Sequence, residues 1–66
     1  MQHYFLDIVG NGRIFADRLG ESHDGEREAR DAAAALVREI GREFGARHGY
    51  AIELLDEKRR LIARIS

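Results

Sequence analysis

The 66-residue sequence contains no cysteine, no proline and no tryptophan. Without cysteine the chain can form neither a disulfide bond nor a thiolate zinc site, which are common supports of very small folds. Without proline the regular structure has few obligatory breaks. A chain of this length has room for a single domain, residues 1–66, which buries only about 60% of the surface that its unfolded chain exposes. We therefore expect a thin core, for which association with a second copy is the remaining common support.

An excess of one charge and long apolar runs are also missing. Eleven Lys and Arg residues balance twelve Asp and Glu residues, which gives a net charge of −1. Such a balance creates no global field that attracts nucleic acid or anionic lipid, so nucleic-acid binding becomes the minority hypothesis. The N-terminal segment lacks the pattern of a signal peptide, and no segment approaches membrane-spanning length. We expect a soluble, cytoplasmic protein that makes no membrane contact.

The N-terminal part of the sequence has the pattern of a β-hairpin. Residues 3–9 are rich in aromatic and β-branched side chains and run into Gly10-Asn11-Gly12. An Asn-Gly pair is typical of a type I′ turn, so a second strand should return over residues 13–17. With a two-residue loop, Ile8 lies opposite Phe15 and Val9 opposite Ile14.

A second hairpin is predicted near the C-terminus, with strands over residues 50–55 and 60–65. A loop of two or four residues gives three apolar cross-strand pairs: Leu54 with Leu61, Ile52 with Ala63, and Tyr50 with Ile65. A three-residue loop would instead set Leu61 opposite Leu55 and mix the two faces. The apolar pattern therefore favours an even loop length.

One long helix is predicted between the hairpins. Its apolar residues recur at spacings of three and four and form one stripe: Ala29, Ala33, Leu36, Val37, Ile40 and Phe44. Charges of both signs cover the opposite side, which is typical of a solvated face. Residues 18–25 are predicted to be a loop, with Asp24 as the helix N-cap and Ser22 as the alternative. The helix should end between residues 44 and 48.

These elements predict an α+β fold of the ββαββ type, in which one long helix packs on one face of a four-stranded antiparallel sheet. The strand order 2-1-3-4 is favoured because it makes every neighbouring pair antiparallel; the alternative joins the two hairpins differently. The face toward the helix should hold the apolar residues of both hairpins: Tyr4, Leu6, Ile8, Phe15, Tyr50, Ile52, Leu54, Leu61, Ala63 and Ile65.

One helix cannot cover both faces of such a sheet, so the second face must meet water or a partner. The candidate interaction residues on that face are Phe5, Val9, Ile14, Leu55, Ile62 and Arg64. Mixed apolar and charged residues of this kind are typical of a modest protein interface. We expect a protein partner, either a second copy bound through this face or an edge strand, or a different protein; a stable monomer is the alternative.

No residue pattern in the sequence indicates catalysis, a metal site, a cofactor or a small-molecule substrate. His3, His23 and His48 are expected on a strand, a loop and a helix end, without the spacing of metal ligands. Residues 10–12 lack the Lys and the following helix of a phosphate-binding loop. Adjacent Ser22, His23 and Asp24 cannot arrange themselves as a hydrolytic triad. The sequence therefore predicts a protein that is not an enzyme.

Several short motifs resemble an uncharacterised family of short bacterial proteins that open with a Tyr-Phe-Phe-Asp-like strand and are known only as a domain of unknown function. The motifs that carry the resemblance are Tyr4-Phe5-Leu6-Asp7, Gly12, Asp17-Arg18-Leu19-Gly20, Ala29, Ala32, Ala51-Ile52-Glu53 and Asp56-Glu57. Leu6 and Arg59 stand where the family pattern would have Phe and a turn Gly. The resemblance supports the fold and implies no activity.

Two functional hypotheses follow from the sequence. The first is a small, non-enzymatic interaction or accessory domain that self-associates. The alternative is an antitoxin-like or nucleic-acid-binding regulatory module, because Phe5, Arg60 and Arg64 suggest a sheet face that stacks bases. A looser similarity to HicB-type antitoxins, which also begin with a hairpin and a helix, belongs to this alternative.

Overall fold

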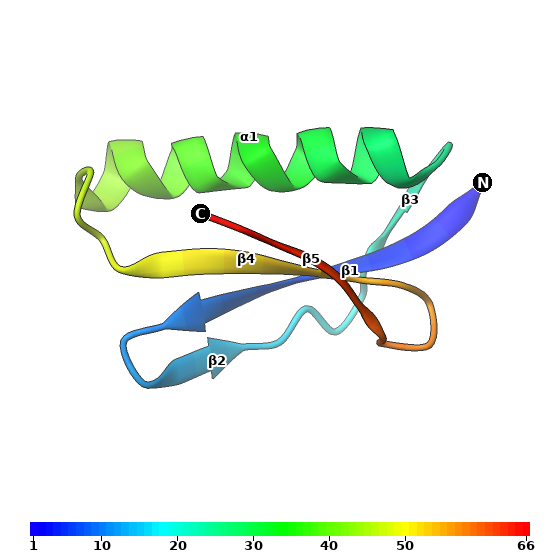
Figure 1. Ribbon diagram of the computed structural model, residues 1–66, viewed down its shortest axis with the longest axis horizontal. Coiled ribbons are helices and arrows are strands. Elements are labelled where there is room, and N and C mark those ends of the chain that lie inside the picture. The colour runs from blue at the N-terminus through cyan, green and yellow to red at the C-terminus, as the bar shows by residue number, and fades with distance from the viewer.

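One helix packs on one face of a five-stranded antiparallel sheet in the computed structural model, which describes residues 1–66 (Figure 1). The elements in chain order are β1 (Gln2–Gly10), β2 (Arg13–Phe15), β3 (Glu21–His23), α1 (Glu26–Phe44), β4 (Tyr50–Leu55) and β5 (Leu61–Ile65). This arrangement confirms the predicted α+β class and the single helix layer. No helix combines the length and the apolar character that crossing a membrane requires.

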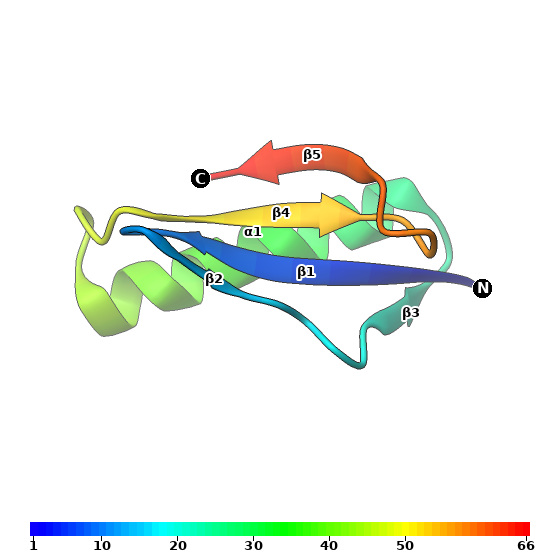
Figure 2. The ribbon, with the colours of Figure 1, turned by 90° about the horizontal axis from the view of Figure 1, so that it is seen from below.

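The sheet has the order β2-β1-β4-β5, and β3 is a fifth strand that also pairs with β1. Figure 2 shows β1 and β4 side by side in the middle, with β2 and β5 at the two edges. The prediction of a four-stranded sheet is therefore wrong in its strand count. The predicted order 2-1-3-4 corresponds to β2-β1-β4-β5 but does not include β3. Residues 21–23 were predicted to be loop, but they pair with residues 2–4 of β1. A three-residue strand is too short to show an alternating pattern in the sequence.

The side chain of Asp17 explains how the chain returns to β1 after β2 ends. Its carboxylate accepts hydrogen bonds from the backbone N–H of Leu6 at 3.1 Å and of Gly20 at 2.9 Å. The first of these bonds replaces a strand-to-strand bond on the edge of β1, and the second closes a short turn. The chain therefore detours around Asp17 and rejoins the same edge as β3.

The first hairpin has the predicted register. Ile8 pairs with Phe15 and Val9 with Ile14. Asn11 and Gly12 both have positive φ, at 54° and 75°, as a type I′ turn requires. The preference of Asn11 and Gly12 for a type I′ turn was therefore sufficient to predict the register of β1 and β2.

The second hairpin differs from the prediction because its turn has three residues, 57–59. Arg59 donates its backbone N–H to the Asp56 carbonyl and has a φ of 61°, and Asp56 and Arg60 close the turn. The Asp56 carboxylate supports this geometry by accepting bonds from the backbone N–H of Lys58 and Arg60. A type I turn followed by a left-handed residue is the usual three-residue hairpin. Leu55 consequently lies opposite Leu61, the pairing that the apolar pattern disfavoured.

A β-bulge one residue later returns Ala63 and Ile65 to the predicted face of the sheet, but the predicted cross-strand pairs of this hairpin are wrong. The pairing shifts between Leu54 and Leu55, so that Leu54 lies opposite Ala63 and Ile52 opposite Ile65. The bulge gives β5 one extra residue, which changes the face on which a side chain lies. Ile62 therefore packs on the helix side against the core, and Leu61 is exposed.

The helix ends within the predicted range but begins differently from the prediction. It ends at Phe44, and Gly45 caps it with a backbone bond to the Gly41 carbonyl. Its N-cap is Gly25, which makes no side-chain hydrogen bond, so the prediction of an Asp24 or Ser22 cap is wrong. Ser22 belongs to β3 instead, because the edge of β1 offers it backbone partners.

The core lies between α1 and the two central strands. Seven buried residues form it: Tyr4, Leu6, Ala29, Ala33, Ile40, Ile52 and Leu54. Alanines at 29 and 33 allow the helix to lie close to the sheet, where Ile52 and Leu54 are fully buried. The predicted apolar face is confirmed at its centre. It is wrong at Leu61, which the three-residue turn sets opposite Leu55 on the other face, and incomplete at Phe15, which is half exposed.

Candidate interaction surface

The sheet face opposite α1 is not covered by any other element of the chain (Figure 1). Of the predicted interaction residues, Val9 and Leu55 are buried among their neighbours, whereas Ile14 on β2 remains 72% exposed. Phe5 is half-buried and Arg64 is exposed. The structure thus leaves much less apolar area on this face than the sequence suggested.

Ile62 does not belong to this face at all. The β5 bulge places it against the core on the helix side, and Leu61 takes its place opposite Leu55. The exposed apolar side chains of the face are therefore Ile14 at one edge and Leu61 at the other.

An ion pair between Asp7 and Arg59 covers the part of the face near Phe5. Asp7 is only 5% exposed, and its carboxylate accepts hydrogen bonds from the Arg59 guanidinium and from the backbone N–H of Asp17 at 2.9 Å. The guanidinium carbon of Arg59 lies 4.9 Å from the centre of the Phe5 ring, which is a cation–π contact. His3 also packs against Phe5, with the two ring centroids 5.2 Å apart and the rings nearly perpendicular.

This cluster connects three segments that are distant in the sequence. Asp7 lies on β1, Asp17 follows β2, and Arg59 belongs to the turn before β5. Both oxygens of the Asp7 carboxylate have partners, so the group is held as a structural anchor and is not presented to a substrate. Neither Asp17 nor Arg59 was predicted to belong to this surface. The available signal was an acidic residue in an apolar strand, which needs a cationic partner once it is buried.

A second ion pair lies in the middle of the same face. Arg64 on β5 lies opposite Glu53 on β4, with a guanidinium-to-carboxylate distance of 3.7 Å. Glu53 in turn lies opposite Asp7 on β1. Paired charges therefore separate the exposed Ile14 from the exposed Leu61, and charged residues are depleted from the cores of protein interfaces.

The most apolar surface feature lies instead on the helix side, at the end of the sheet that carries the Asn11-Gly12 turn. Between α1 and the edge strand β2 there is a groove of about 240 Å³, lined only by Ile8, Phe15, Ile40, Phe44 and Tyr50. Phe44 is 67% exposed, and Phe15 is half exposed. The rings of Phe44 and Tyr50 lie 6.1 Å apart along one wall. The sequence assigned these residues to the core and did not predict that the helix would leave them uncovered.

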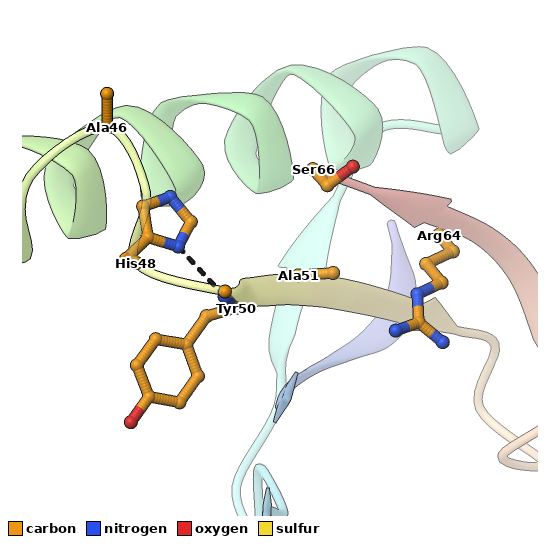
Figure 3. A pocket seen from close by; sticks show the side chains of 7 residues that line it. Ala46, His48, Tyr50, Ala51, Arg64 and Ser66 are labelled. Atoms are coloured by element: carbon orange, nitrogen blue, oxygen red, sulfur yellow. Dashed lines mark hydrogen bonds between the residues drawn. The ribbon is translucent and has the colours of Figure 1, made fainter. Parts of the chain in front are cut away.

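A larger, polar hollow of about 430 Å³ lies between the segment after α1 and the end of β5. Figure 3 shows its two basic side chains, His48 and Arg64, at opposite ends. His48 accepts a hydrogen bond at Nδ1 from the backbone N–H of Tyr50 at 2.9 Å, which occupies that nitrogen. The polar groups do not converge on a common point, so the hollow does not have the geometry of a catalytic or anion-binding site.

His23 has a structural role at the junction of β3 and α1. Its two ring nitrogens contact the carboxylates of Glu21 at 2.8 Å and Glu28 at 3.1 Å. The hydrogen bond to Glu21 raises the pKa of His23 above its ordinary value, with a smaller contribution from Glu28 and an opposing contribution from burial. The imidazole therefore ties the third strand to the first turn of the helix. No three His, Cys, Asp or Glu side chains are grouped so that they could hold a metal ion.

The chain matches a protein family over nearly its whole length. The family model described as "Domain of unknown function (DUF6894)" matches residues 3–66. No curated protein and no solved structure matches the chain. The match spans nearly the whole chain, which confirms the resemblance to a family of unknown function.

Proposed function

The chain belongs to the DUF6894 family, a domain of unknown function, and we propose that it acts as a non-enzymatic protein-interaction domain that self-associates. The observation that carries this proposal is the wholly apolar groove beside β2, which α1 leaves open. Large apolar side chains that are exposed next to one another are characteristic of interaction surfaces. A cytoplasmic location is part of the proposal, and the absence of cysteine is compatible with a reducing compartment.

The thin core gives a physical reason for self-association. Only 11 of the 66 residues are buried. Each further Å² of apolar surface that is removed from water contributes about 25 cal/mol, so covering Phe15 and Phe44 adds a significant fraction to the stability of so small a domain. A partner bound at the groove would thus bury apolar side chains that a single copy leaves exposed to water.

Sedimentation velocity over a range of protein concentrations tests this function. We expect the sedimentation coefficient of the wild type to rise with concentration, and Phe44→Gln to abolish the rise. Leu19→Gln is the matched control, because Leu19 is also a highly exposed apolar residue but lies outside the groove. A wild type that stays monomeric at high micromolar concentration contradicts self-association.

The nucleic-acid-binding or antitoxin-like alternative rests on the aromatic and basic residues of the open face. Phe5 and Arg59 do place an aromatic ring and a guanidinium on that face, where the guanidinium lies over the ring. However, Arg59 is paired with Asp7, and Arg64 lies next to Glu53, which leaves little net positive charge there. Salt-dependent binding to single-stranded RNA or duplex DNA would support the alternative, and its absence would remove the nucleic-acid part.

A further inference from the structure

We propose that two copies of the chain pair through their β2 strands, antiparallel and around a twofold axis at Ile14, so that their two sheets join into one. This inference rests on the proposed self-association and names its interface. It commits to a second copy as the occupant of the groove because the β2 edge is complementary to itself.

The two edges of the sheet differ in how they are protected against pairing. Natural edge strands are commonly protected by bulges and by charged side chains. The β5 edge has both, since a bulge interrupts its ladder and Arg60 and Arg64 are exposed along it. The β2 edge has no bulge, and beside the exposed Arg13 its other two residues are the exposed Ile14 and Phe15. An edge that lacks a bulge and has apolar side chains on both faces is suited to strand addition.

The backbone of β2 offers its free hydrogen-bonding groups at one residue. Arg13 and Gly10 form the pair next to the two-residue turn, so the backbone of Arg13 points toward β1. By alternation, the N–H and C=O of Ile14 point toward the free edge. Placing Ile14 opposite Ile14 of the second copy lets the two residues exchange both hydrogen bonds, which satisfies these groups symmetrically.

This register also pairs the side chains favourably. With Ile14 on the axis, Arg13 of each copy lies opposite Phe15 of the other. Both residues are on the helix side of the sheet, because Phe15 lines the groove and Arg13 is two positions away. A guanidinium over an aromatic face is a favourable contact of the kind already seen between Arg59 and Phe5.

The groove supplies the rest of the contact. The β2 ladder has only three residues, so backbone pairing alone is short. In this arrangement, however, the two grooves lie on the same side of the joined sheet, one on each side of the axis, and Phe15 and Phe44 line each of them. The small area implies a weak dimer whose population depends on concentration.

Cross-linking through a single engineered cysteine tests the register directly, because the chain has no cysteine of its own. In the proposed dimer the two residues at position 14 have Cα atoms about 5.5 Å apart, within the range of a disulfide bond. Leu61→Cys is the matched control, since Leu61 is exposed on the opposite edge strand. Under mild oxidation we expect Ile14→Cys to form a covalent dimer at least about tenfold faster than Leu61→Cys. Circular dichroism of both reduced variants confirms that they are folded.

The outcomes separate this inference from the function on which it rests. Fast cross-linking of Ile14→Cys, together with self-association of the wild type, supports both. A wild type that self-associates while Ile14→Cys cross-links no faster than Leu61→Cys overturns the β2 interface but leaves self-association standing. A wild type that is monomeric at high micromolar concentration overturns both, as does capture of the groove by an unrelated protein without self-association.

Discussion

Arg59 combines a favourable side chain with an unfavourable backbone, and two substitutions separate these effects. Its guanidinium pairs with the buried Asp7 and stacks on Phe5, but its φ of 61° is costly for any residue with a Cβ atom. Arg59→Ala removes the side-chain contacts and keeps the backbone cost. Arg59→Gly removes the same contacts and relieves that cost. The difference between the two variants therefore measures the backbone term alone.

The expected magnitudes follow from the contacts. A hydrogen bond to a buried charge contributes roughly 1.5–3 kcal/mol, which we reduce to about 1.5 kcal/mol because the Arg59 side chain is 44% exposed. The cation–π contact adds about 0.5 kcal/mol. Arg59→Ala should thus lower the free energy of unfolding by about 2 kcal/mol, and Arg59→Gly by about 1 kcal/mol. For a domain of this size these losses lower Tm by about 10 °C and about 5 °C.

Urea unfolding followed by circular dichroism measures both variants beside the wild type. A double-mutant cycle with Asp7→Asn isolates the ion pair, because Arg59→Ala should have a much smaller effect once the carboxylate is gone. The reasoning is refuted if Arg59→Gly is less stable than Arg59→Ala, or if Arg59→Ala unfolds within about 0.5 kcal/mol of the wild type.

Two further predictions concern glycines and pH. Gly10→Ala should destabilise by about 3 kcal/mol, because its Cβ would lie 2.2 Å from the Gly49 carbonyl oxygen at a φ of 142°. Gly41→Ala, in the helix with open space around it, should stabilise by about 0.5–1 kcal/mol. Urea unfolding should therefore show that Gly10→Ala and Gly41→Ala change the free energy of unfolding in opposite directions. Because Glu21 raises the pKa of folded His23 above 6.5, the folded state holds this proton more tightly. The resulting stability is complete below about pH 6.5 and is lost as pH rises through the folded pKa, so His23→Gln should be more harmful at about pH 5.5 than at about pH 9. An equal effect of His23→Gln at both pH values would count against this assignment.

The sequence predicted the fold wherever a local signal was strong. The Asn11-Gly12 turn fixed the first hairpin and its register, and the apolar stripe located α1. The second hairpin was harder because its left-handed position is occupied by Arg59, where a glycine would have revealed a three-residue turn. The bulge that follows places Ile62 against the core, and this tertiary contact cannot be predicted from the local sequence pattern.

The candidate surface was predicted less well than the fold. Alternation correctly placed Val9, Leu55 and Arg64 on the face of Phe5 but wrongly placed Ile62 there. It also gave no information on how far neighbouring side chains bury Val9 and Leu55. The groove went unrecognised because Phe15 and Phe44 carry the pattern of core residues. Whether such residues are covered depends on the angle and length of the helix, and these are properties of the assembled domain.

The central position of β1 and β4 has a consequence for the order of events in folding. Each hairpin closes over a few residues, whereas the pairing of Phe5 with Leu55 closes a loop of roughly fifty residues and carries a larger entropic cost. We therefore expect the two hairpins to form early and their meeting at the β1–β4 seam to be the last major step. In stopped-flow experiments Gly12→Ala should then mainly slow folding, and Ala51→Gly should mainly accelerate unfolding. The turn thus controls mainly the folding rate, and the contact between β1 and β4 controls mainly the unfolding rate.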